Sequence, residues 1–99
     1  MFSIYILQSL KDNRFYIGYS KNPEIRFIQH NEISTDSYCS KLRPWIMVAS
    51  IQISENLSEV IRVERYIKRQ KKRRFILLII EKSNDQEFIE WLRNKSSAG

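Results

Sequence analysis

The sequence predicts an α+β domain: a small central, mostly antiparallel three-stranded sheet flanked by helices, in the order β-β-α-β-α-α. Two runs rich in Ile, Tyr and Leu lie close together near the N-terminus, and a third apolar run covers residues 44–53. Patterns that begin helices follow the second and the third run. With 99 residues, of which 42% are hydrophobic, the chain can build one folded domain with one core.

The first two predicted strands, residues 3–9 and 15–20, form an antiparallel hairpin. The polar segment 11–14 (KDNR) between them has the composition of a turn. The second strand contains Gly18, one of only two glycines in the chain. Because glycine weakens a strand, it indicates either a bend of the backbone or the close approach of another group.

A helix is predicted to begin at residues 22–24 (NPE) and to continue to about Asn31. Asparagine can cap a helix, proline suits the first helical position, and an early glutamate complements the helix dipole. Ile25 and Ile28 are expected to pack this helix onto the domain. Residues 32–43 are polar and irregular.

The third strand is expected over residues 44–53, and a long helix should follow it. Asn56 and Glu59 resemble a capping box, so this helix is predicted from Leu57 to the basic run at residues 68–74. The next segment, FILLII at residues 75–80, is wholly apolar. It is compatible with a buried helix or a buried strand, because periodicity does not separate the two.

Asn84 with Glu87 marks the start of a last helix, whose buried stripe would be Phe88, Ile89 and Leu92. We expect a single domain over residues 1–93, with a disordered tail over residues 94–99.

Composition and charge favour a polyanionic partner, most simply nucleic acid. The formal net charge is +6 and the pI is about 9.7. The single cysteine, Cys39, excludes an internal disulfide and a thiolate zinc cluster. The apolar N-terminal stretch is too short for a membrane span and lacks the features of a signal peptide. We therefore expect a cytoplasmic protein without a membrane partner.

Glu64 interrupts the apolar side of its predicted helix. At about 100° per residue, Val60, Val63 and Ile67 form one stripe, and Glu64 projects into it. A carboxylate there is costly unless it is paired or binds a cation. Two interpretations remain open: an ordinary ion pair with Lys68 one turn later, or a cation-binding carboxylate.

Arg26 and His30 lie one turn apart, so they are expected to share a helix face. Arginine suits phosphate and histidine can relay a proton, although a solvated polar face explains the pair equally well. His30 is the only histidine, which excludes multi-histidine metal sites. Tyr5 and Tyr16 lie on the two hairpin strands, where packing is the ordinary role and proton transfer the alternative.

The segment 68–74 (KRQKKRR) carries six basic residues in seven. It is either a solvated helix end whose cations complement the dipole or a surface that follows a phosphate backbone. We favour nucleic-acid binding, because this run dominates the net charge. Its basic residues are Lys68, Arg69, Lys71, Lys72, Arg73 and Arg74.

Together these residues resemble the GIY-YIG nuclease superfamily, above all its small stand-alone single-domain bacterial members and the N-terminal domain of excision-repair nucleases. Residues 3–5 (SIY) are similar to the first motif and residues 16–18 (YIG) to the second. Segment 18–31 matches the helix with the family's arginine and histidine, residues 44–45 match the start of the third strand, and segment 58–74 matches the helix that carries the family's glutamate. The matching residues are Arg26, His30 and Glu64, with a lysine one turn later, and the resemblance covers roughly residues 2–80.

The resemblance implies hydrolysis of phosphodiester bonds in DNA by an endonuclease that acts in DNA repair or recombination. One Mg²⁺ or Mn²⁺ ion would lie on Glu64 and stabilise charge on the scissile phosphate. Tyr5 or Tyr16 would take the proton of the attacking water, and the resemblance does not decide which. Arg26 would neutralise phosphate charge, and His30 would hydrogen-bond a tyrosine or the water.

The resemblance also implies that Gly18 lets the strand end pass close to the following helix. The basic run, together with Lys41 and Arg43, would hold the DNA backbone. Because active relatives often take their substrate choice from another domain or protein, a partner protein that supplies specificity is also implied.

The chain departs from the family pattern at two positions. Ser3 replaces the usual glycine of the first motif. Many active members carry an asparagine after the glutamate helix, for which this chain offers Asn84, rather far along. Besides a metal-dependent endonuclease, two other functions remain open. One is a non-catalytic nucleic-acid-binding module of the same fold, and the other is a small interaction domain whose basic run binds an acidic protein.

Overall fold

The centre of the molecule is a three-stranded antiparallel sheet with the strand order β2-β1-β3. In the computed structural model, which describes residues 1–33 and 40–98, the strands are β1 (Phe2–Ser9), β2 (Phe15–Ser20) and β3 (Trp45–Ser54). β1 pairs with both neighbours in antiparallel register. The predicted α+β class, the hairpin and the third strand are confirmed.

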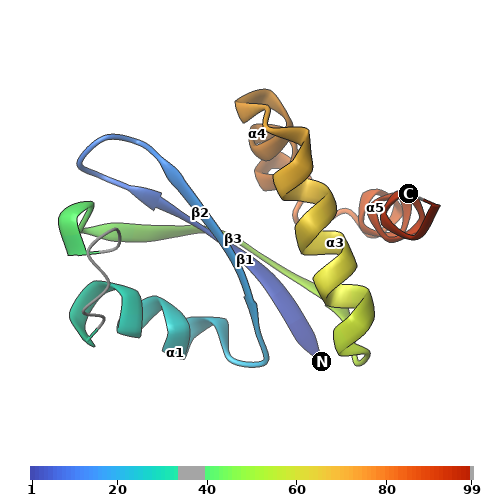
Figure 1. The fold of residues 1–99 in the computed structure, drawn as a ribbon, viewed down its shortest axis with the longest axis horizontal. Helices are drawn as coiled ribbons and strands as arrows, with labels where there is room; N and C mark the ends of the chain where they lie inside the picture. The colour runs from blue at the N-terminus through green and yellow to red at the C-terminus, as the bar shows by residue number, and fades with distance from the viewer. Residues whose placement is uncertain (34–39, 99) are drawn as a thin grey trace.

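Helices cover both faces of this sheet (Figure 1). The short helix α1 (Pro23–Ile28) packs on one face and continues into a π-helical segment, η1 (Gln29–Ile33). On the other face lie α3 (Leu57–Gln70), α4 (Arg73–Glu81) and α5 (Gln86–Ala98). Within the part of the chain that the structure describes, no helix is long and apolar enough to cross a membrane.

The two faces of β1 contribute to two different cores, because successive side chains of a strand point to opposite sides. Ile4 and Ile6 face α3, α4 and α5, where they join the larger core. Tyr5 and Leu7 face α1 and form a smaller cluster with Trp45. β1 is therefore buried along almost its whole length.

A register shift in β3 allows side chains of this strand to pack in both cores. Leu7 pairs with Met47, but Ile6 pairs with Ala49, so β3 has one extra residue at this point. Such a bulge turns the following side chains to the opposite face. Trp45 consequently packs beside Tyr5, whereas Ile51 packs in the larger core.

α3 has the predicted start and the predicted buried stripe. The Asn56 side chain accepts a hydrogen bond from the Glu59 amide at 3.3 Å, as a capping residue does. Val60, Val63 and Ile67 are buried against the sheet, with 0–1% of their surface exposed. The helix ends at Gln70, and the next residue, Lys71, is in left-handed conformation. The basic run 68–74 is therefore divided between the end of α3, a turn and the start of α4.

The apolar segment 75–80, which the sequence left open between helix and strand, is helical and belongs to α4. It is only partly buried: Ile79 is fully buried, whereas Leu77 is 49% exposed. A strand of this composition would need cover on both faces, and a helix needs it on one side only.

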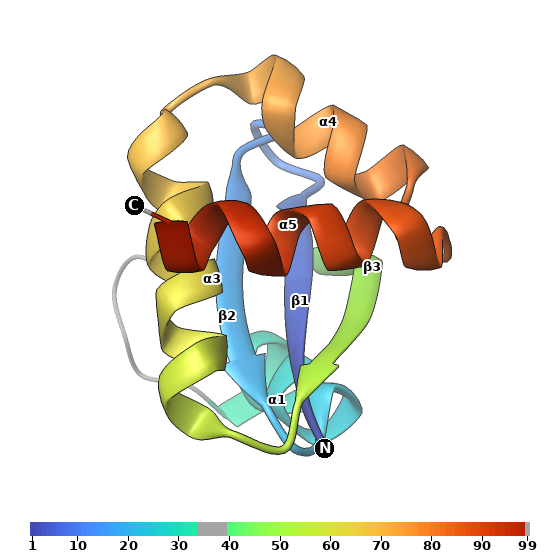
Figure 2. The same cartoon turned by 90° about the vertical axis from the view of Figure 1, so that its right-hand side faces the viewer.

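α5 corrects two expectations. Its N-terminal amides bond to Asp85, whose Oδ1 accepts from Glu87 and Phe88 at 3.0 and 3.2 Å, so Asp85 is the capping residue rather than Asn84. The helix also continues to residue 98, so the disordered tail expected from residue 94 is wrong for residues 94–98. Ser96 is buried, and Figure 2 shows α5 crossing the strands with α3 beside it. The predicted buried Ile89 and Leu92 are confirmed.

α1 also differs from its expected packing. Asn22 makes no side-chain cap bond, and Ile25 and Ile28 are 54% and 48% exposed. The side chain that packs on the sheet is Phe27, against the cluster around Tyr5. Because the chain passes into π geometry after residue 28, spacing along a regular α-helix does not describe how its later residues are placed.

Candidate active site

The two motif tyrosines are brought together by the β1–β2 register. Tyr5 lies opposite Gly18, and Leu7 lies opposite Tyr16. The two tyrosines are therefore diagonal neighbours on the same face, with ring centroids 6.3 Å apart and planes inclined by 27°. Both rings point to the α1 side of the sheet.

Gly18 is required because the Tyr5 ring lies over it. A Cβ atom at this position would be 2.6 Å from the Tyr5 hydroxyl oxygen, 2.7 Å from its Cζ and 3.2 Å from Cε1 of Tyr16. The backbone of Gly18 does not have positive φ, so conformational freedom is not the reason for glycine here. Of the two explanations the sequence allows, close approach is the right one. The approaching group is a tyrosine ring, whereas the resemblance implied the following helix.

His30 lies behind the tyrosines. Its Nε2 is 3.2 Å from the Tyr5 hydroxyl oxygen, and its ring centroid is 4.4 Å from that of Tyr16. The side chain is 6% exposed. Its backbone carbonyl accepts a hydrogen bond from Nε of Arg43 at 2.9 Å. The histidine therefore holds the two tyrosine rings, and Arg43 holds the segment that carries the histidine.

The segment after α1 is also attached to β3. The Asn31 side chain donates to the Trp45 carbonyl at 2.8 Å and accepts from the Trp45 amide at 2.6 Å. A single amide side chain thus bonds both backbone groups at the start of β3. Because His30 directly precedes Asn31 in the chain, these bonds also fix His30 relative to the sheet.

Glu64 reaches the same place from α3. Its side chain is 13% exposed, and its Oε1 is 3.1 Å from Nζ of Lys68. The ion pair expected from the spacing is therefore present. The Lys68 side chain is 52% exposed, whereas the carboxylate also lines a cavity of about 340 Å³. The cavity is lined by Tyr5, Tyr16, Ile17, Gly18, Tyr19, Arg26, Glu64 and Lys68.

Arg26 and His30 do not share one helix face in the way that the spacing predicts. Arg26 is exposed and lines the cavity, and its Nη1 donates to Oε1 of Gln29 at 2.8 Å. His30 is buried behind Tyr5 instead. The change from α to π geometry between them separates the two side chains.

The predicted DNA-binding residues are spread over several surfaces. Lys68 lines the cavity, and Lys41 is exposed in the segment that precedes β3. Arg43 is partly buried and bonded to His30, which makes it a structural residue here. Lys72 and Arg74 are exposed near the start of α4.

Two arginines of the basic run lie over aromatic rings. Arg69 is 6.0 Å from the Tyr66 ring centroid, and Arg73 is 4.5 Å from that of Phe15. Arg73 also donates to the Asn13 carbonyl at 2.9 Å. These contacts fix the two side chains against the domain.

Arg62 and Arg65 belong to a further basic cluster, outside the predicted DNA-binding residues. With Arg69 and Ser96 they line a hollow of about 180 Å³. The three arginines recur at i, i+3 and i+7 along α3, so the helical period contained this signal. Asn84, by contrast, lines a different hollow together with Ser50 and Arg93, and it does not supply an asparagine to the cavity around Glu64.

The donor groups fit a hard divalent ion held mainly by water. In residues 1–33 and 40–98, no group of three or more His, Cys, Asp or Glu side chains is arranged to hold a metal. Glu64 is the single carboxylate among the described residues that line the cavity, and its contact with Lys68 shows that it accepts a cation there. Mg²⁺ commonly takes one or two carboxylates and keeps several waters, which matches this arrangement. Cys39 lies outside the described residues.

The comparison with protein families agrees with this geometry. The model of the GIY-YIG catalytic domain matches residues 1–77, which include β1, β2, α1, β3 and α3. A search among curated proteins finds no match. The matched region carries both tyrosine motifs and the glutamate helix. This chain belongs to the GIY-YIG nuclease superfamily.

Proposed function

We propose that this protein is a divalent-metal-dependent endonuclease that hydrolyses phosphodiester bonds in DNA. The observation that supports the proposal is the composition of one cavity. Three phenols, a guanidinium, a carboxylate and an ammonium group line it, and they come from β1, β2, α1 and α3. Hydrolysis of a phosphodiester needs a proton acceptor, cations for the phosphate and a ligand for a metal ion, and these groups supply all three.

Arg26 and Lys68 would bind the scissile phosphate. Both line the cavity, and both are exposed enough to reach a bound strand. The planar guanidinium of Arg26 can donate two hydrogen bonds to phosphate oxygens, and Lys68 adds a point charge. As charge develops on the phosphate, the two cations stabilise it.

Tyr16, in its ionised phenolate form, would accept the proton of the attacking water at its phenolic oxygen. Tyr5 is less suited, because it is 1% exposed and its hydroxyl lies 3.2 Å from His30. Tyr16 is only partly buried and reaches the cavity from the edge strand β2. Tyr5 and His30 would then act as positioning residues that hold the Tyr16 ring.

Glu64 would hold Mg²⁺ or Mn²⁺ with one carboxylate, after Lys68 turns from the carboxylate toward the phosphate. The bound ion would stabilise negative charge on the phosphate and on the leaving oxygen. We also propose a role in repair or recombination in the cytoplasm, with a partner protein that supplies specificity.

The experiment compares the purified protein with Glu64→Gln on labelled duplex, single-stranded, flap and four-way-junction DNA, with Mg²⁺, with Mn²⁺ and with chelator. We expect cutting that needs the metal and is lost in Glu64→Gln. Glu81→Gln is the matched control, because Glu81 is an exposed glutamate at the end of α4 and does not line the cavity. In the same assay Tyr16→Phe should lose more activity than Tyr5→Phe.

A non-catalytic nucleic-acid-binding module is the second candidate. Two observations favour it: Lys68 occupies the Glu64 carboxylate, and Asn84 lies away from the cavity. Binding of DNA by both the wild type and Glu64→Gln, without cutting under any metal condition, would establish this alternative and refute the nuclease proposal.

A further inference from the structure

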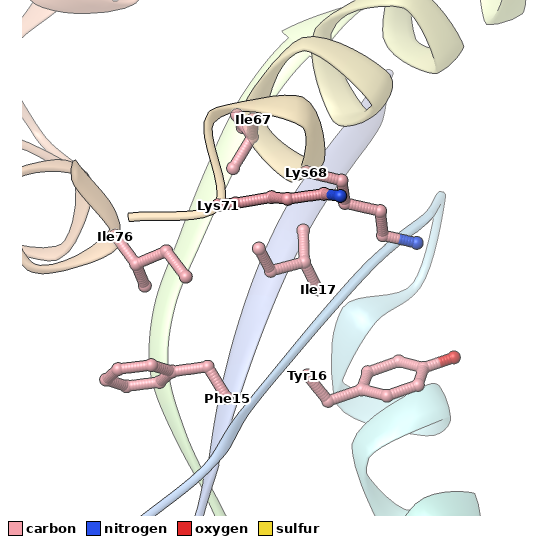
Figure 3. A pocket seen from close by; sticks show the side chains of 7 residues that line it. All are labelled: Phe15, Tyr16, Ile17, Ile67, Lys68, Lys71 and Ile76. Carbon is pink, nitrogen blue, oxygen red and sulfur yellow. The ribbon is translucent and has the colours of Figure 1, made fainter. Parts of the chain in front are cut away.

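A second hollow adjoins the cavity described above (Figure 3). It has a volume of about 260 Å³ and lies between β2 and the ends of α3 and α4 that meet at residues 71–72. Its floor is apolar, and two lysines lie at its rim. The lining residues are Phe15, Tyr16, Ile17, Ile67, Lys68, Lys71 and Ile76.

The hollow is formed by the alternation of β2 and by the break between the two helices. Phe15 and Ile17 point from the strand toward α3 and α4, whereas the Tyr16 ring points to the opposite side (Figure 3). Ile67 is contributed by the last turn of α3 and Ile76 by the first turn of α4. Because β2 is an edge strand, no other strand within residues 1–33 and 40–98 pairs with its outer side.

Lys71 occupies a backbone position where glycine is usual. Its φ of 51° and ψ of 29° are left-handed, the conformation that most often ends a helix with glycine. A lysine there places a long cationic side chain across the hollow, which Lys68 also lines (Figure 3). Each of these lysines is exposed.

The hollow shares part of its wall with the cavity that Glu64 lines. Tyr16, Ile17 and Lys68 line both. A DNA strand whose phosphate lies between Arg26 and Lys68 would therefore place its next nucleotide over the hollow. Lys71 would then lie near the following phosphate of that DNA strand.

We propose that this hollow binds one unpaired nucleobase of the DNA strand, beside the phosphate in the cavity. The inference rests on the proposed function and names its substrate class, DNA with a single-stranded segment. A base has flat apolar faces between two charged phosphates, which matches an apolar floor with lysines at the rim. The volume is slightly below the 300 Å³ or so at which pockets for drug-sized ligands begin, so one base fits better than a larger group.

The base must be unpaired because a paired base is stacked inside the duplex and cannot enter a hollow in the protein. Phe15 provides the aromatic surface, and the Arg73 guanidinium, 4.5 Å from its ring centroid, keeps this ring in place. The protein would thus recognise unpaired DNA without reading its sequence, since every base has an aromatic face.

The test measures binding in chelator, so that cutting plays no part. Two labelled single strands of equal length are compared, one of thymidine nucleotides and one of abasic nucleotides, which carry the same phosphate charge. We expect the wild type to bind the strand with bases about tenfold more tightly or better. Ile76→Glu and Phe15→Leu, each checked for folding by circular dichroism, should reduce this ratio to near one.

Leu77→Glu is the matched control for Ile76→Glu. It introduces the same charge at the next residue of α4, where the side chain is 49% exposed and does not line the hollow. Its affinity for both strands can fall, but the ratio between them should remain that of the wild type. Phe15→Leu keeps an apolar side chain, so it tests the aromatic ring without adding a charge.

The inference is overturned if the wild type binds both strands equally, or if its preference survives in Ile76→Glu and Phe15→Leu. Its failure is separable from failure of the nuclease proposal. Metal-dependent cutting that is lost in Glu64→Gln, together with equal binding of both strands, refutes only the base site. A preference for bases without any cutting supports the base site and refutes the nuclease.

Discussion

Replacement of Gly18 by alanine tests how the two motif tyrosines are held together. The added Cβ would lie 2.6 Å from the hydroxyl oxygen and 2.7 Å from Cζ of Tyr5. Against an ordinary contact of 3.4 Å, the Tyr5 ring must move by about 0.8 Å. This ring is 1% exposed and bonded to His30, so it has little room to move.

The magnitude follows from overpacking. Adding a methyl group to a tightly packed site costs about 1–3 kcal/mol in the free energy of unfolding. For a domain of this size, that lowers the melting temperature by about 5–20 °C. A shift of nearly 1 Å at the proposed site should also reduce cutting by about 100-fold, through displacement of the tyrosine hydroxyls.

The assay is a double-mutant cycle by urea denaturation and circular dichroism. In a Tyr5→Leu background the ring is absent, and Gly18→Ala should become neutral or stabilising by up to ~1 kcal/mol, because alanine restricts the unfolded chain and the native φ is not positive. An equal cost in both backgrounds, or no cost in the wild type, would refute the explanation that Gly18 makes room for Tyr5.

Three further substitutions test how the site is built. Asn31→Ala removes both hydrogen bonds to the backbone at the start of β3 and should cost about 2 kcal/mol by urea denaturation; a cost under about 0.5 kcal/mol would contradict that role. Lys71→Gly should stabilise the fold by about 1 kcal/mol yet weaken binding of single-stranded DNA, whereas Asn13→Gly, at the other left-handed position, should leave binding unchanged. Equal DNA affinity of the wild type and Lys71→Gly would rule out the role of this lysine. Lys68→Met should strengthen Mn²⁺ binding at Glu64 about fivefold in a titration without DNA, because it removes a competing charge 3.1 Å away, and unchanged affinity would show that the ion does not bind there.

Much of the fold follows from local patterns. The hairpin, the third strand and α3 with its Asn56 cap are confirmed because period-two and helical alternation, together with capping chemistry, act over a few residues. The helical state of residues 75–80 and the length of α5 were not predictable in this way. Both depend on which neighbours cover each side of the segment.

The candidate site shows the same difference between what local sequence patterns predict and what tertiary contacts decide. Residue types and spacing drew attention to Tyr5, Tyr16, Arg26 and Glu64, and the family resemblance assigned them to one site. The structure brings all four to one cavity. Helical spacing wrongly assigned the packing of α1 to two exposed isoleucines. It also wrongly placed His30 beside Arg26, because the π segment after residue 28 changes the rotation per residue.

The chain alone determines its pattern of strands and helices, its positive charge and the chemical groups available for a reaction, since these depend on residue type and short-range spacing. Tertiary structure decided which groups meet. The β1–β2 register sets the Tyr5 ring over Gly18, and the packing of α3 on the sheet brings the Glu64 carboxylate to the same cavity. The end of α3 at Lys71 leaves the adjoining hollow beside β2. Contacts between segments far apart in the chain depend on how complete side-chain surfaces pack together, which no local pattern contains.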